Sequence, residues 1–70
     1  MYVIWDIHLN GNTKNFGGLE WVVDGEYGRE TYPGSWAECT VREHYREGRT
    51  FDRIVKEHKA TLKKLEPGRR

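Results

Sequence analysis

The chain has little cysteine and no long apolar run, and each shortage excludes a class of protein. Its single cysteine, Cys39, allows neither an internal disulfide nor a cysteine-rich zinc site. No apolar run approaches the ~18 residues that a membrane-spanning helix needs. The first nine residues lack the basic start of a secretory signal and alternate too regularly for its apolar segment. We therefore expect a soluble, cytoplasmic protein without a membrane partner.

Charge is unevenly distributed along the 70 residues, although the formal net charge is only +1. Residues 1–34 contain two Lys/Arg and five Asp/Glu, a net charge of −3. Residues 35–70 contain ten Lys/Arg and six Asp/Glu, a net charge of +4. The overall balance neither requires nor excludes a polyanionic partner, but the second half of the chain offers one a basic surface.

Aromatic side chains are abundant for so short a chain. A core of this size supplies only a few kcal/mol of net stability. The nine aromatic residues, three of them tryptophan, partly compensate, because each buries roughly 150–250 Å². Either most of them fill one compact core, or some belong to a binding surface.

Residues 19–38 contain the strongest structural signals. Asp24-Gly25 lies between two β-prone runs and predicts a hairpin with a two-residue turn. This turn would pair Val23 with Glu26, Val22 with Tyr27, Trp21 with Gly28, and Glu20 with Arg29. Pro33-Gly34 would then end the second strand. Ser35 and Glu38 have the spacing of a capping box, which predicts that a helix begins there.

The first residues predict another strand. Residues 2–9 alternate, with Val3, Trp5, Ile7 and Leu9 on the expected core face and Tyr2, Ile4, Asp6 and His8 on the other. Asn10-Gly11 predicts a second two-residue turn, which would place Trp5 opposite Phe16. A strand over residues 13–23 then needs a bulge at Gly17-Gly18 to keep Phe16 and Trp21 on one face. The alternative is that residues 10–18 form a long loop.

Two helices are expected in the second half of the chain. The first spans residues 36–47 and ends at Gly48; its inner stripe is Ala37, Thr40, Val41, His44 and Tyr45. The second spans residues 51–65, begins at a Thr50 cap and ends before Pro67-Gly68; its stripe is Phe51, Ile54, Val55, His58, Leu62 and Leu65.

These elements predict an α+β fold in the order β-β-β-α-α. A three-stranded antiparallel β-meander would be followed by two α-helices, with a helix packed on one sheet face. Residues 1–66 would form a single small domain and residues 67–70 a basic C-terminal tail. Whether the second helix returns to the sheet or projects from it is left open by the pattern.

Residues able to support catalysis or bind a metal are few and poorly spaced. Cys39 and His44 are five positions apart on the first helix and point away from each other. His44 and His58 could meet between the helices, but packing in the core is the simpler interpretation. No nucleophile, base and orienting group occur together. We therefore expect no enzymatic activity, no metal or cofactor, and no small-molecule ligand.

The outer sheet face is the first candidate surface. Apolar side chains there, ringed by charged ones, are typical of a protein-binding patch, and burial by a second subunit or by the second helix is the alternative. The candidates are Tyr2, Ile4, Glu20, Val22, Tyr27 and Arg29. An acidic rim of Glu20, Glu26 and Glu30 would favour a basic partner such as a nucleic-acid-binding enzyme. By class-level analogy alone, small proteins of this kind include inhibitors encoded by phages and mobile elements.

The second helix is the other candidate surface. Its outward side and the tail are basic, so they could follow a phosphate backbone; the alternative is that these side chains only solvate the helix. The candidate nucleic-acid-binding residues are Arg53, Lys56, Lys63, Lys64, Arg69 and Arg70. Residues 41–55 loosely resemble the start of a helix-turn-helix, but the pattern continues as one helix without a separate recognition helix.

Overall fold

The computed structural model describes residues 1–64, and these form a three-stranded sheet followed by two helices. In chain order the elements are β1 (Ile4–Gly11), the short 3-10 helix η1 (Asn15–Gly18), β2 (Leu19–Gly25), β3 (Gly28–Pro33), α1 (Glu38–Arg46) and α2 (Phe51–Lys64). The sheet is antiparallel in the order β1-β2-β3. The predicted α+β class and β-β-β-α-α order are confirmed, whereas Leu65 and the predicted tail, residues 67–70, lie outside the described part.

The β2–β3 hairpin is present, but its turn is Glu26-Tyr27 rather than Asp24-Gly25. Gly25 lies within the ladder opposite Gly28. A Cβ at Gly25 would collide with the carbonyl oxygen of Val3 and lie 2.9 Å from the Tyr45 hydroxyl. Close packing at this position therefore requires a residue without a side chain. Gly25 is used for this packing, and the turn falls two residues later. Since the pairing moves by an even number of residues, Trp21 and Val23 keep their predicted inward orientation.

The β1–β2 connection differs from the predicted two-residue turn at Asn10-Gly11. β1 continues to Gly11, which pairs with Leu19, and residues 12–18 form a loop that includes η1. Asn12 and Phe16 adopt positive φ angles of 58° and 51°. The predicted second strand therefore begins at Leu19 and not at residue 13, and the predicted Trp5–Phe16 pairing is wrong. The chain here is close to the alternative of a long loop.

A bulge does interrupt the alternation, but it lies in β1 and not at Gly17-Gly18. The extra residue is Trp5, between the pairs Ile4–Gly25 and Asp6–Asp24. Ile4 and Ile7 therefore both pack against the core. The prediction that Val3 and Trp5 face the core and Ile4 faces outward is wrong, because one inserted residue reverses the faces of everything before it.

The core lies between the sheet and α1. Val23, Tyr32, Val41 and Tyr45 are all fully buried. The Tyr45 hydroxyl donates to the Gly28 carbonyl oxygen (2.7 Å) and accepts from the Tyr27 amide (2.9 Å). Burial raises the pKa of Tyr45 above its usual value, and it does the same to the pKa of Tyr32. The α1 tyrosine thus closes the hairpin while it fills the core.

The predicted start of α1 is wrong, whereas its predicted end is confirmed. The helix begins at Glu38, with Ala37 as its N-cap, so the predicted Ser35–Glu38 capping box is wrong. Trp36 instead lies outside the helix, where its carbonyl oxygen accepts a hydrogen bond from the indole of Trp21 (2.9 Å). The C-terminal prediction is confirmed. Gly48 has a φ of 75°, and its amide bonds to the Tyr45 carbonyl oxygen at 2.9 Å, which ends the helix in a Schellman motif.

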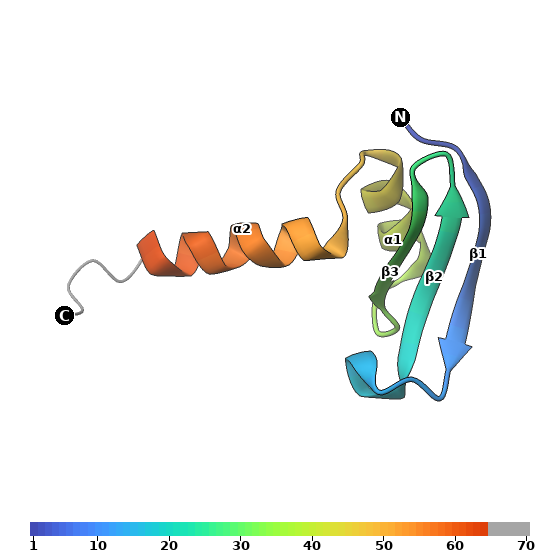
Figure 1. Cartoon of the computed structure of the whole chain (residues 1–70), viewed down its shortest axis with the longest axis horizontal. Coiled ribbons are helices and arrows are strands. Elements are labelled where there is room, and N and C mark those ends of the chain that lie inside the picture. Colours follow the sequence, from blue (N-terminus) through green and yellow to red (C-terminus); the bar gives the residue numbers. More distant parts are fainter. Residues whose placement is uncertain (65–70) are drawn as a thin grey trace.

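α2 leaves the sheet instead of packing along it (Figure 1). Thr50 caps it as predicted, since its hydroxyl accepts from the Arg53 amide at 3.2 Å. Only its first residue is held by aromatic contacts: the Phe51 ring lies 5.1 Å from that of Phe16 and 5.8 Å from that of Trp36. The radius of gyration is 14.2 Å, compared with about 11 Å for a compact chain of this length.

Candidate protein-interaction surface

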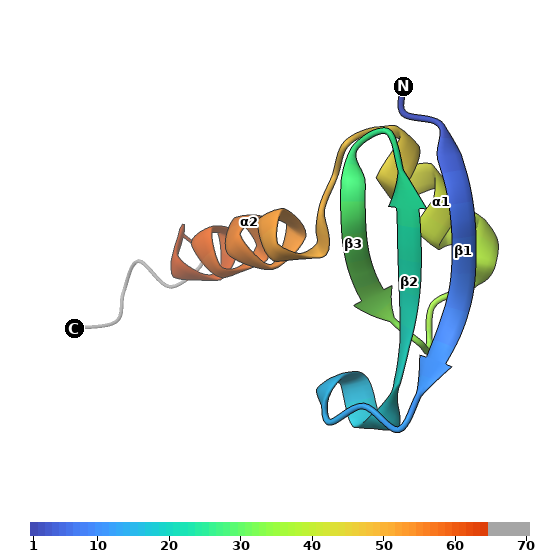
Figure 2. The ribbon, with the colours of Figure 1, turned by 45° about the vertical axis from the view of Figure 1, so that its right-hand side comes forward.

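One face of the sheet is covered by α1, and the other is open (Figure 2). Because Val23 and its cross-strand neighbours point to α1, the alternating residues point away from it. We call these side chains the open face: Asp6, His8 and Asn10 from β1, Glu20, Val22 and Asp24 from β2, and Arg29, Thr31 and Pro33 from β3. The open face is therefore mainly polar, with Val22 at its centre.

Carboxylates dominate the charge of the open face, and each of them lies within polar contact of another side chain of this face. Arg29 donates two hydrogen bonds to the Asp24 carboxylate, of 2.9 and 3.0 Å. This guanidinium holds the pKa of Asp24 below its usual range. Asp6 bonds to His8 Nδ1 at 2.8 Å, and Asn10 Nδ2 lies 3.5 Å from a carboxylate oxygen of Glu20. Three carboxylates against one guanidinium give the open face a net charge of −2 with His8 neutral.

Trp5 is the one tryptophan outside the core, and the residue is 72% exposed. The bulge causes this exposure. Two residues, Trp5 and Asp6, occupy the length of strand opposite Asp24 and lie between the inward-facing Ile4 and Ile7. Exposing an indole to water forfeits a large apolar burial. β-Bulges commonly redirect a side chain in this way beside functional sites.

The six predicted protein-binding residues divide between two surfaces. Glu20, Val22 and Arg29 point to the open face, as expected, but Glu20 is only 9% exposed there and Val22 only 6%. Ile4 does not, because the bulge turns it towards the core. The remaining two are tyrosines at the hairpin end of the core.

These tyrosines pack with α1 and not on the open face. The rings of Tyr2 and Tyr27 lie 4.7 Å apart, and Tyr27 also meets the buried Tyr45 edge-on at 5.8 Å. Tyr2 covers Gly48, where a Cβ would approach its ring to 2.9 Å. The expected apolar patch of Tyr2, Ile4, Val22 and Tyr27 is therefore not assembled. Trp5, which the pattern places inside, is instead the most exposed aromatic residue of the described part.

Three of the predicted nucleic-acid-binding residues have described side chains, and all three lie on α2. Arg53, Lys56 and Lys63 are exposed, and Arg53 pairs with Glu57 at 3.2 Å one turn further along the helix. The side chain of Lys64, together with Arg69 and Arg70, lies outside the described part. Lys59 adds a further exposed positive charge to the same helix.

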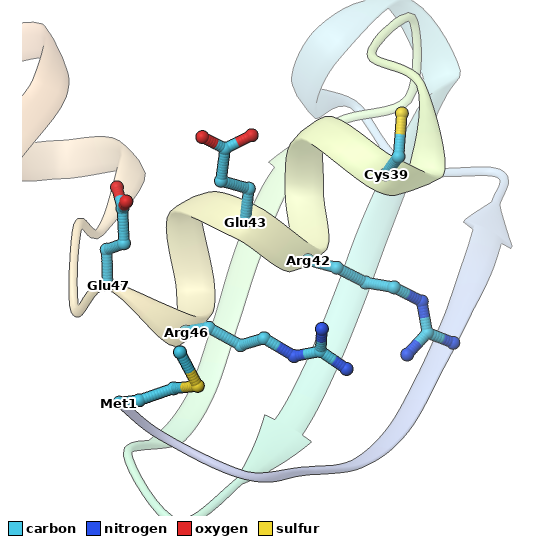
Figure 3. A pocket seen from close by; sticks show the side chains of 6 residues that line it. All are labelled: Met1, Cys39, Arg42, Glu43, Arg46 and Glu47. Atoms are coloured by element: carbon cyan, nitrogen blue, oxygen red, sulfur yellow. The ribbon is translucent and has the colours of Figure 1, made fainter.

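A shallow groove runs along the outer side of α1 and has a volume of about 310 Å³. Its lining, shown in Figure 3, is Met1, Cys39, Arg42, Glu43, Arg46 and Glu47. Arg42 is engaged by Glu38 at 2.8 Å. Two arginines and two glutamates cancel in charge, so the groove favours neither an anion nor a cation.

The histidines and the cysteine do not form a joint site. His44 packs on Trp36 with ring centroids 5.1 Å apart, whereas His58 is exposed on α2 and Cys39 is exposed on α1. Among the residues described, no three His, Cys, Asp or Glu side chains are grouped so as to hold a metal ion. In the same part of the chain, neither helix is long and apolar enough to cross a membrane.

Comparison of the chain with protein-family models, with curated proteins and with solved structures finds no match. Among the surfaces of the described residues, the open face, with Trp5 on its edge strand, is the best defined.

Proposed function

We propose that this protein is a non-catalytic protein-binding module that docks on a partner protein through the open face, with Trp5 as its anchor. The observation that carries this proposal is the β1 bulge, which turns a tryptophan out of a small core and leaves it 72% exposed. In a domain of this size each buried aromatic side chain adds appreciably to a small net stability, so exposing a tryptophan is costly unless a partner covers it.

The surroundings of Trp5 fit such an interface. Tryptophan is the residue type most enriched among those that dominate binding energy. The side chains of the open face beside Trp5 are mainly polar, as at the rim of an interface. The bulge also interrupts the free edge of β1, which disfavours pairing with a strand of another protein at that edge. Docking through the open face is therefore the better-supported mode.

The charge of the open face indicates the kind of partner. A net charge of −2 on one face, with Glu26 at the adjoining turn, favours a basic protein surface. Surfaces that bind nucleic acids are basic, so an inhibitor of a nucleic-acid-binding enzyme is the partner relationship that fits best. Association steered in this way should slow as salt rises, while dissociation depends mainly on the apolar anchor.

Substitution of Trp5 by alanine tests the proposal. We expect at least a roughly 30-fold loss of affinity, equivalent to about 2 kcal/mol, because the anchor is removed. The partner is first captured from lysate of the native host with tagged wild-type protein, and the affinity of the purified pair is then measured by calorimetry.

Leu9→Ala is the matched control, because Leu9 lies on the same strand and is 48% exposed, but is paired with the inward-facing Trp21. Both variants should give the wild-type circular dichroism spectrum. Equal affinity for the partner in the wild type and the well-folded Trp5→Ala variant would refute docking through Trp5.

A second candidate function is nucleic-acid binding by α2, and the projection of this helix from the sheet favours it. Lys56, Lys59 and Lys63 are accessible along its length. Reversing Lys56, Lys63 and Lys64 to glutamate should abolish a gel shift seen at low salt, and the wild-type affinity should fall steeply as salt rises. Absence of any shift with duplex or single-stranded probes at tens of micromolar protein would reject this alternative.

A further inference from the structure

The apolar stripe of α2 is half-buried at Phe51, Ile54 and Val55 but uncovered beyond Lys56 in the single chain. Every side chain from Lys56 to Lys63 is exposed, including Leu62 at 44%. A helix of 14 residues is marginal in water on its own, since helices of this length are stabilised mostly by packing of their apolar side. α2 therefore needs a surface against which to pack, and its own chain supplies one only at the start of the helix, where Phe51, Ile54 and Val55 are half-buried.

The spacing of the stripe indicates what kind of surface this is. Phe51, Val55, His58 and Leu62 follow one another at intervals of four, three and four residues. This is the spacing of a coiled-coil seam, in which two helices contact each other along alternating positions of a heptad, and the half-buried Ile54 lies beside it.

We propose that α2 pairs antiparallel with α2 of a second copy of this chain. In an antiparallel pair each seam position meets the complementary one of the other helix. Phe51 then packs against Leu62 of the second copy, and Val55 against His58 of the second copy. The two-fold axis of the dimer passes between residues 56 and 57, at the middle of the helix.

Charges beside the seam select this orientation. Asp52 and Lys59 occupy equivalent flanking positions one heptad apart. In the antiparallel pair these positions face each other, so each Asp52 meets Lys59 of the other copy and two ion pairs form. In a parallel pair Lys59 would lie beside Ile54 instead, and no opposite charge would be matched.

The shape of the chain also favours the antiparallel arrangement. α2 extends away from the sheet in both views (Figures 1 and 2), and its length is about 21 Å. Antiparallel pairing places the two sheets at opposite ends, whereas parallel pairing would crowd them together. The tip of each helix, at Leu62, would reach the aromatic base of the other, where Phe51 contacts the 36%-exposed Phe16.

The dimer leaves the open face of each copy free, so this inference does not depend on the proposed function. It predicts a two-headed molecule with one Trp5 surface at each end. Four seam residues per helix make a short interface, and the dimer should therefore form in a concentration-dependent way.

Sedimentation equilibrium of the full chain from micromolar to millimolar concentration tests the pairing. The wild type should shift from monomer to dimer. Leu62→Glu should remain monomeric, because it introduces a charge into the seam. Ala60→Glu is the control, since residue 60 lies on the opposite side of α2 and should dimerise like the wild type. A wild type that is monomeric at every concentration, or a dimer that survives Leu62→Glu, would overturn the proposal.

Charge exchange tests the orientation. Asp52→Lys or Lys59→Asp alone converts two attractive contacts per dimer into repulsive ones and should weaken dimerisation about tenfold. The double variant Asp52→Lys/Lys59→Asp restores opposite charges and should recover most of this loss. Any effect of Asp52→Lys on the start of α2 is shared by the double variant. If the double variant dimerises no more tightly than the weaker of the two single variants, the antiparallel register is rejected.

Discussion

The two helices of this protein have similar patterns but different environments. α1 has nine residues and α2 has fourteen, and α2 has the more regular apolar spacing. Yet Val41 and Tyr45 of α1 are fully buried, whereas α2 is exposed from Lys56 to Lys63. We call the sheet with α1 the body and α2 the arm. The difference teaches that an amphipathic pattern predicts a helix but not the surface that covers it.

The connection between the helices decides which one is covered. The chain leaves α1 through the left-handed Gly48, and Phe51 is then fixed between Phe16 and Trp36. With the start of the arm held at this point beside β3, the rest of the helix points away from the sheet (Figure 1). Two predictions compare the stability of body and arm, and two concern the place where they meet.

The largest expected effect is in the body. Tyr45→Ala removes a fully buried ring and leaves the Tyr27 amide and Gly28 carbonyl without their partner. It should lower the free energy of unfolding by about 3–5 kcal/mol, which is most of the stability of so small a domain. The matched change in the arm, Leu62→Ala, should cost the monomer less than about 0.5 kcal/mol. Urea unfolding of dilute protein measures both, and equal losses would remove the distinction between body and arm.

The next effect is at the joint. Gly48→Ala forces a side chain into the left-handed region, where φ is 75°, and brings its Cβ to 2.9 Å from the Tyr2 ring. We expect a loss of about 1–2 kcal/mol. Gly17→Ala, at a φ of 70° but with open space around the Cβ, is the control that isolates backbone strain from the contact. Thermal unfolding of both variants measures the two losses of stability. A loss for Gly48→Ala no larger than that for Gly17→Ala would show that the Tyr2 ring moves aside at no measurable cost.

A smaller effect is expected when the arm is shortened. A chain that ends at Val55 retains Phe51 and its aromatic contacts but lacks the exposed part of α2. Its free energy of unfolding at low concentration should agree with that of the full chain within about 0.5 kcal/mol. A drop of several kcal/mol would mean that the arm stabilises the body of its own chain.

The smallest effect concerns Glu30, which lies where body and arm meet. Burial and the nearby Asp52 raise the pKa of Glu30 above its usual value. The folded state therefore binds the Glu30 proton more tightly than the unfolded state does. Its ionisation costs stability at neutral pH, and this cost disappears as pH falls through the raised pKa towards 4.5, the ordinary value.

Glu30→Gln should accordingly raise the free energy of unfolding at pH 7 and change it little near pH 4. Urea unfolding at several pH values measures this difference. Asp52→Asn should give a weaker change in the same direction, since burial is the larger cause. A Glu30→Gln variant less stable than the wild type at pH 7 would contradict the assignment.

Local patterns predicted the element types and several of their ends. The Gly48 stop, the Thr50 cap and the Val41–Tyr45 stripe could be read from neighbouring residues, because each depends on contacts within one or two helical turns. The Asp24-Gly25 turn and the Ser35–Glu38 cap are equally local signals, and both were wrong. Gly25 is needed where β1 and Tyr45 approach the hairpin, and Trp36 is held by Trp21 outside the helix.

The site was less predictable than the fold. Glu20, Val22 and Arg29 were placed on the open face correctly, because strand alternation is local to β2 and β3. Trp5 was missed. The alternation of Val3, Trp5, Ile7 and Leu9 fits an unbroken strand with Trp5 inside. The spacing of Ile4 and Ile7 fits a bulged strand with Trp5 outside equally well, so the sequence does not distinguish the two.

The sequence by itself determined that three strands precede two helices, since hydrophobic periodicity and helix caps act over a few residues. Only the tertiary structure decided where the hairpin turns, that Trp5 faces water, and that α2 leaves the sheet. Each of these depends on contacts between residues far apart in the chain: Gly25 with Val3 and Tyr45, Ile4 with the core, and Phe51 with Phe16. Packing of distant segments outweighs local preference wherever two local arrangements differ by only a kcal/mol or so.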